Sequence, residues 1–223
     1  MGEPPETSIT RPRESMQRDE GPYYGGTLIN QVQLNRIDWL LNPAPGQGPG
    51  DIGFPPSAPF PELLDSFTQL MIRWLDPEVC PALQRLAFGA ILYLPVDSRV
   101  EGYRQLSAYL PSVVLDVEGS SDFVYRINRP RKSASGISGL KVNRLSKWTV
   151  VTSALFEQMI DLSEGSPSSG DFGRTKQSFA CQLELDINTQ PGLQKPLPQQ
   201  QLTQVFEELV NLGKEIAVRG DIP

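Results

Sequence analysis

The residues best suited to chemistry in this sequence are the basic side chains between Phe123 and Phe156. This window holds seven of the chain's 20 Lys and Arg residues and no Asp or Glu. Guanidinium and ammonium groups bind phosphate and carboxylate oxygens, and aromatic rings can stack on nucleic-acid bases. The candidate contacts for a nucleic acid or an acidic protein partner are Arg126, Arg129, Arg131, Lys132, Lys141, Arg144, Lys147 and Trp148, with Tyr125 as a second aromatic ring.

Two interpretations of this basic window remain open. In the first, the window binds nucleic-acid phosphates. In the second, it forms a basic face that pairs either with the acidic remainder of this chain or with an acidic partner. The chain carries a net charge of −6 at pH 7 and has a pI of about 4.8, so the whole molecule is not an electrostatic nucleic-acid binder. Alternation along strands also sends half of the charges to each face. These observations favour an acidic protein surface over nucleic acid.

Carboxylates form a second candidate group. Asp116, Glu118 and Asp122 lie in one stretch, and Glu184 and Asp186 share a face of a predicted strand. Such oxygens can hold Mg²⁺ or Ca²⁺, or act as a general acid and base, which gives a carboxylate-dependent hydrolase as a third hypothesis. However, the sequence DVEGSSD lacks the spacing of a calcium loop, and charges on a half-exposed strand usually form its solvated face. We therefore expect no metal and no other cofactor.

The chain contains no histidine, which excludes Ser-His-Asp and Cys-His nucleophiles and His-ligated zinc or haem. The glycine-rich stretches GQGPGDIG and SGISG lack the Lys-Ser/Thr sequence of phosphate-binding loops. Cys80 and Cys181 are the only cysteines, and we expect both to be buried thiols in a reducing compartment. The sequence therefore predicts that the protein is not an enzyme.

The cellular setting is predicted from what the sequence does not contain. The first 21 residues carry charges throughout and have no apolar run of the signal-peptide kind. The longest nearly apolar run, Leu86–Val96, is too short to span a membrane. We expect a cytoplasmic protein without membrane contact.

The hydrophobic pattern predicts an α+β fold with an antiparallel sheet, two hairpins and three main helices. Residues 1–21 are predicted to be a flexible N-terminal tail and residues 22–223 a single α+β domain. The order of elements suggests a pseudo-duplicated ββαβ-like arrangement with halves at 22–115 and 116–223. The predicted strands are 27–33, 36–42, 83–96, 122–131, 140–152 and 179–187, and the predicted helices are 62–76, 99–110 and one within 198–220.

Three features refine this prediction. The first hairpin should turn at Leu34-Asn35, and the strand within 83–96 should be buried on much of both faces. The Pro- and Gly-rich stretches 43–61 and 163–173 are predicted loops, and long loops of this kind often contact partners. A helical stripe near the C-terminus is predicted to be core, with a partner-docking face as the alternative. The stripe consists of Leu202, Val205, Phe206, Leu209, Leu212 and Ile216.

Three segments together resemble a sporadically distributed family of uncharacterised prokaryotic proteins of about this length. They are TLINQVQLNRIDWLLN, then EGSSDFVYRINRPR followed by GLKVNRLSKW, and LELDINTQP with the closing helix. The resemblance covers roughly residues 25–223 and implies no catalytic residues. A sporadic distribution is similar to that of toxin–antitoxin or phage-defence components. The expected function is a non-enzymatic protein-binding or regulatory subunit of such an accessory system, and the alternative is a nucleic-acid-binding module that uses the hairpin 123–152.

Overall fold

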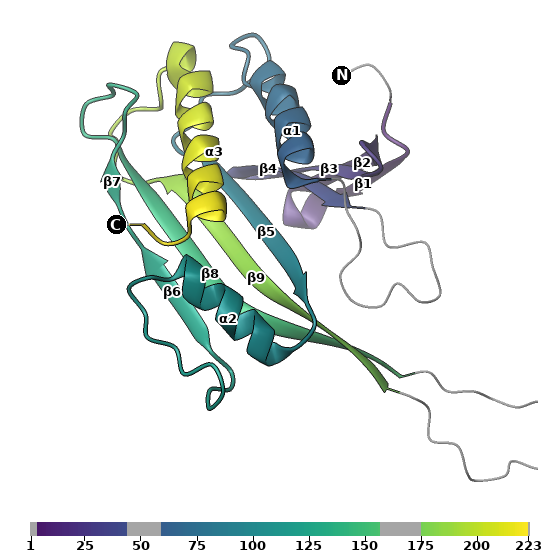
Figure 1. The fold of residues 1–223 in the computed structure, drawn as a ribbon. Coiled ribbons are helices and arrows are strands. Elements are labelled where there is room, and N and C mark those ends of the chain that lie inside the picture. Colours follow the sequence, from purple (N-terminus) through teal and green to yellow (C-terminus); the bar gives the residue numbers. More distant parts are fainter. Residues whose placement is uncertain (1–3, 44–58, 157–174, 223) are drawn as a thin grey trace, which may run out of the picture. The chain divides into compact units, whose positions relative to one another are not determined.

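The computed structural model describes residues 4–43, 59–156 and 175–222 (Figure 1). These residues form two antiparallel sheets, of four and five strands, and three α-helices. The predicted α+β class, with its hairpins and three helices, is confirmed. The predicted loop at 163–173 lies outside the described residues, as does most of the predicted loop at 43–61.

The described residues belong to two compact units. Residues 4–43 and 59–71 form the first unit, and residues 72–156 and 175–222 form the second. This differs from the predicted single domain with halves at 22–115 and 116–223. The reason is that a strand from the first predicted half, β5 (Ala87–Val96), pairs along its whole length with β9 (Thr175–Thr189) from the second.

The first unit is built on a four-stranded meander in which each strand pairs with the next in the chain. Gln33 pairs with Arg36, so the predicted two-residue turn at Leu34-Asn35 is confirmed. The elements of this unit are β1 (Thr7–Arg11), β2 (Met16–Tyr23), β3 (Gly26–Gln33), β4 (Arg36–Pro43) and α1 (Phe60–Trp74), whose last residues belong to the second unit.

Strands β1 and β2 correct the prediction that residues 1–21 are a flexible tail. Thr7 pairs with Glu20 and Arg11 with Met16, while Gln17 of β2 pairs with Val32 of β3. Every residue of β1 is exposed, so this strand is held by backbone hydrogen bonds with almost no apolar burial. A hydrophobic pattern cannot reveal a strand of this kind.

The second unit contains a sheet with the strand order β5-β9-β8-β6, and the short strand β7 pairs with β8 beside β6. All of the pairings are antiparallel. In addition to β5 and β9, the unit comprises α2 (Arg99–Tyr109), β6 (Val124–Asn128), β7 (Arg131–Lys132), β8 (Lys141–Phe156) and α3 (Leu202–Arg219).

Helices α2 and α3 cover the same face of this sheet. A Cβ on Gly213 of α3 would lie 2.7 Å from the ring of Phe88, and a Cβ on Gly102 of α2 would lie 2.8 Å from the side chain of Val150. Only glycine permits such close packing at these two positions. The opposite face of β5 stays open, with Ile91 59% exposed, so the prediction that this strand is buried on both faces is wrong.

The apolar stripe of α3 is core, as predicted. Its six predicted residues are between 0% and 5% exposed, because the helix lies along the covered face of β5, β9 and β8. Among the described residues, no helix combines the length and the hydropathy that a membrane crossing requires.

Candidate anion-binding site

The basic residues of the 123–156 window are divided between the two faces of the second-unit sheet, as strand alternation requires. Arg126 and Lys147 are paired across β6 and β8 on the open face. The Nζ of Lys147 lies 2.8 Å from Oε1 of Glu184 on β9. Lys147 therefore pairs with an acidic residue of its own chain.

Trp148 lies on the helix-covered face and is only 3% exposed. Its ring stacks on Tyr109 of α2 with ring centroids 5.6 Å apart, and its Nε1 donates a hydrogen bond to Ser146 Oγ at 3.1 Å. A nucleic-acid base or a partner protein cannot reach a ring in this position. Trp148 is therefore not a contact residue, contrary to the prediction.

Arg129 binds a carboxylate close to the end of the chain. Its Nε and Nη2 donate hydrogen bonds to the two oxygens of Asp221 at 2.7 and 2.8 Å, and the hydroxyl of Tyr125 donates to Asp221 Oδ2 at 2.8 Å. The hydrogen bond from Arg129 lowers the pKa of Asp221, whereas burial and this carboxylate raise the pKa of Tyr125. We call Arg129, Tyr125 and Asp221 the C-terminal lock; its members are occupied within the chain.

The backbone after α3 is shaped for this lock. Gly220 has φ of 82°, and a Cβ there would lie 2.1 Å from the carbonyl oxygen of Tyr109. The Asp221 N–H donates to that same carbonyl at 2.9 Å. Nothing in the sequence singles out Asp221, because its partner Arg129 lies 92 positions away and no local pattern connects them.

The remaining basic residues lie at one end of the sheet and are exposed. Lys132 of β7 is paired directly with Lys141 of β8, and Arg131 is paired with Val142. Like charges that face each other across two strands destabilise the pairing. The turn between them is held by α3, since Glu208 accepts hydrogen bonds from Ser133 Oγ at 2.6 Å and from the N–H of Ala134 at 2.8 Å.

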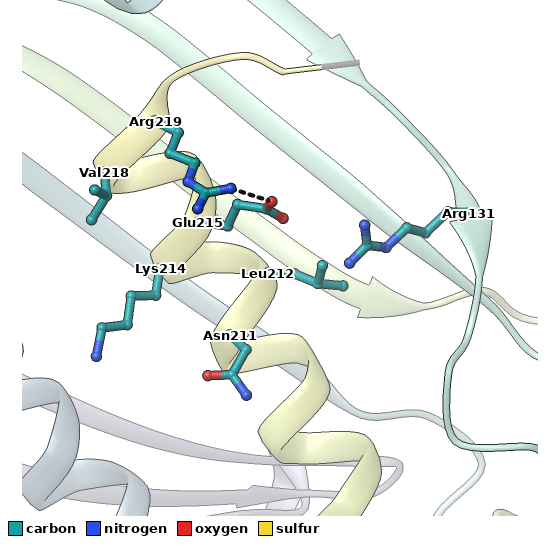
Figure 2. A pocket seen from close by; sticks show the side chains of 7 residues that line it. All are labelled: Arg131, Asn211, Leu212, Lys214, Glu215, Val218 and Arg219. Carbon is teal, nitrogen blue, oxygen red and sulfur yellow. Dashed lines mark ion pairs between the residues drawn. The ribbon is translucent and has the colours of Figure 1, made fainter.

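An open pocket of about 360 Å³ lies between Arg131 and the last turns of α3 (Figure 2). Figure 2 shows the guanidinium of Arg131 directed across the pocket toward the helix. Glu215 and Arg219 form an ion pair of 3.7 Å on the helix side. The lining residues are Arg131, Asn211, Leu212, Lys214, Glu215, Val218 and Arg219.

Arg144 is not part of this lining, but it forms an ion pair with the lining residue Glu215; it lies on the covered face of β8 and is 6% exposed. Its Nη2 is 3.6 Å from Oε2 of Glu215, which is beyond hydrogen-bond distance, and its buried Nε has no hydrogen-bond partner among the described residues. The pKa of Arg144 is lowered, first by burial and next by the charge of Arg131, while the carboxylates of Glu215 and Asp221 act in the opposite direction. Arg144 is a buried cation with incomplete compensation, which is costly.

The pocket and its surroundings form a cationic site in an acidic chain. The lining contains the cations of Arg131, Lys214 and Arg219 and one carboxylate, that of Glu215, which also forms an ion pair with the buried Arg144 behind it. Guanidinium groups bind carboxylates and phosphates with charge-assisted hydrogen bonds, often through two parallel contacts. The arrangement is chemically suited to an oxyanion group.

The predicted carboxylates do not converge. The described residues contain no group of three or more Asp, Glu or Cys side chains that could hold a metal ion. Asp116 accepts a hydrogen bond from the N–H of Gly119 at 3.0 Å, and Asp186 accepts one from Asn188 Nδ2 at 2.7 Å. The contacts of these two carboxylates are therefore local ones that shape a loop and the open face of the sheet.

Both thiols are buried and free. Burial raises the pKa of Cys80, and it raises the pKa of Cys181 to about 11. A thiol that stays protonated at neutral pH is a poor nucleophile. Neither cysteine adds reactive chemistry to the site.

Comparison of the chain with protein-family models, curated proteins and solved structures finds no match. The family resemblance noted in the sequence stays a prediction, and the site is assigned from its own residues.

Proposed function

We propose that this protein is a non-enzymatic binding module that recognises an acidic segment of a partner protein. The binding surface is the cationic end of the second unit, which we define as Arg131, Lys214 and Arg219. All three residues are exposed, and they come from β7 and the end of α3. Complementary charge of this kind directs which partner binds and speeds association.

The observation that carries this proposal is the pocket between Arg131 and α3. Its lining combines cationic groups with the amide of Asn211 and the apolar side chains of Leu212 and Val218. Asp and Glu side chains on an extended segment, with apolar residues between them, match such a lining. Arg131 forms no ion pair within the described residues, so its guanidinium is available to a partner.

Two observations favour an acidic protein over nucleic acid. A single-stranded nucleic acid needs a continuous basic track with aromatic rings for its bases. Here Trp148 is buried, Tyr125 donates to Asp221, and Arg126 lies on the opposite face of the sheet from Arg144. The net charge of −6 also repels a long polyanion more than a short acidic segment, because the repulsion grows with the number of charges brought near the chain.

The test is fluorescence anisotropy with a labelled oligoglutamate peptide that contains interspersed leucines, compared with labelled single-stranded DNA. The variant is Arg131→Ala, and the matched control is Arg126→Ala, an exposed arginine of the same window on the open face. We expect Arg131→Ala to weaken peptide binding about fivefold and Arg126→Ala to weaken it by less than about twofold. No peptide binding at low salt, or tighter binding of DNA that both variants weaken equally, would overturn the proposal.

The proposal includes the regulatory role in an accessory system that the resemblance suggests. Affinity purification from the native host with the wild-type protein and with Arg131→Ala tests this part. A partner with an Asp- and Glu-rich segment should be retained by the wild type and lost with the variant. If the wild type and Arg131→Ala retain the same proteins, the pocket is not needed for any regulatory complex.

A further inference from the structure

We propose that Glu215 occupies the place of a ligand's oxyanion group, and that a carboxylate or phosphate displaces it to bind between Arg131 and Arg144. This inference rests on the proposed function and deepens it, because it names the group that enters the pocket and the residue that competes with it.

The guanidinium of Arg144 is buried and incompletely paired. A guanidinium presents five N–H donors and is rarely buried without partners for them. At Arg144 the nearest carboxylate oxygen is 3.6 Å from Nη2, and Nε is both buried and without a partner among the described residues. The site is therefore built around a cation whose hydrogen-bonding capacity the described chain does not fill.

The carboxylate of Glu215 is held loosely. Its two oxygens lie 3.6 Å from Arg144 and 3.7 Å from Arg219, so neither contact is a hydrogen bond. The side chain is 33% exposed, and its ion pair with the exposed Arg219 contributes little free energy. A carboxylate held in this way is easily displaced.

The side chain of Arg131 places a second cation near Arg144. Figure 2 shows its side chain reaching across the pocket toward Leu212 and Glu215. The charges of Arg131 and Arg144 are close enough for the first to lower the pKa of the second. An oxyanion between them converts this repulsion into two attractions. Glu215 then keeps Arg219, four residues further along the helix, as its remaining partner.

The sharpest test removes the competing carboxylate and nothing else. Glu215→Gln keeps the shape of the side chain and should raise the affinity for the labelled oligoglutamate peptide about fivefold. The matched control is Glu207→Gln, the same change of charge at an exposed position two turns earlier on α3 and outside the pocket lining. Screening by salt at that separation should keep its effect below about twofold.

A double variant links the gain to the pocket. In Glu215→Gln with Arg131→Ala, the gain should disappear, since the oxyanion loses one of its two cations. Arg131 is exposed, so this variant is expected to fold even if a change at buried Arg144 does not.

Inorganic phosphate and acetate are the two small probes, and the shift in melting temperature measures their binding. The comparison shows whether the site binds a phosphate or a carboxylate. It also tests this inference independently of the proposed function. A ligand that binds the native state raises the melting temperature, and it should do so more in Glu215→Gln than in Glu207→Gln. If the peptide binds but Glu215→Gln and Glu207→Gln behave alike, the inference is wrong while the proposed function stands. If phosphate or acetate distinguishes the two variants but no variant binds the peptide, the inference stands and the acidic protein partner is wrong.

Discussion

The second unit contains two arginine–carboxylate pairs that differ in how completely they are made. In the C-terminal lock, Arg129 meets both oxygens of Asp221 at 2.7 and 2.8 Å, and Tyr125 supplies a third hydrogen bond. Beside the pocket, Arg144 is more deeply buried than Arg129, yet the carboxylate of its ion pair, Glu215, lies 3.6 Å away. In the lock, both carboxylate oxygens and two guanidinium nitrogens are paired, whereas beside the pocket the buried Nε of Arg144 has no partner among the described residues. Completeness of pairing thus separates a structural ion pair from a candidate binding site.

The largest expected effect comes from deleting α3 and everything after it, which removes both Asp221 and Glu215. Truncation after Gln201 also removes the six buried side chains of the stripe, each of which contributes roughly 1.5–3 kcal/mol. This loss approaches the whole stability of a domain, about 5–15 kcal/mol. The second unit should lose its cooperative transition in a circular dichroism melt. A transition at an unchanged temperature would show that α3 is not core.

Breaking the lock alone should have the next largest effect. Asp221→Asn leaves the guanidinium of Arg129 half-buried without its carboxylate, and we expect a loss of about 2–3 kcal/mol in the free energy of unfolding. Glu215→Gln, the equivalent change at the pocket, should cost less than Asp221→Asn, because it breaks no hydrogen bond. Urea denaturation of the two variants gives both values. Equal losses would remove the distinction between a complete and an incomplete pair.

The lock also predicts a dependence of stability on pH. The pKa of Asp221 is lowered in the folded state, so its contribution is fully present above the unfolded pKa of roughly 3.9. The contribution is lost as the pH falls through the lower, folded pKa. The difference in unfolding free energy between the wild type and Asp221→Asn should therefore be constant above about pH 5 and shrink below about pH 4. A difference that shrinks between pH 7 and pH 5 would contradict this assignment.

A feature of the fold or of the site is predictable from the sequence when its residues form a local pattern. The turn at Leu34-Asn35 and the stripe of α3 were predicted because alternation and helical periodicity are local properties. Strands β1 and β2 were missed because polar residues form them, and the lock was missed because Arg129 and Asp221 are distant in sequence. Alternation correctly implied that the basic window would be divided. It could not say that α2 and α3 would bury the side with Arg144.

A smaller effect is expected at the turn that carries the cationic end. Glu208→Gln weakens two hydrogen bonds that hold Ser133 and Ala134, and should cost about 1 kcal/mol in urea denaturation. Its neighbour Glu207, which is exposed, provides the matched control with an expected change below about 0.5 kcal/mol. Similar values for the two variants would mean that Glu208 does not anchor the turn.

The central claim is that the incomplete pair binds an oxyanion and the complete pair does not. Its most direct test is NMR of the arginine Nε–H resonances of the full chain during titration with inorganic phosphate and with acetate. We predict that the Arg144 resonance shifts and saturates, while the Arg129 resonance stays where it is because Asp221 already occupies that guanidinium. An Arg144 resonance that does not move with either anion, or one that moves only as much as Arg129 does, would contradict the claim.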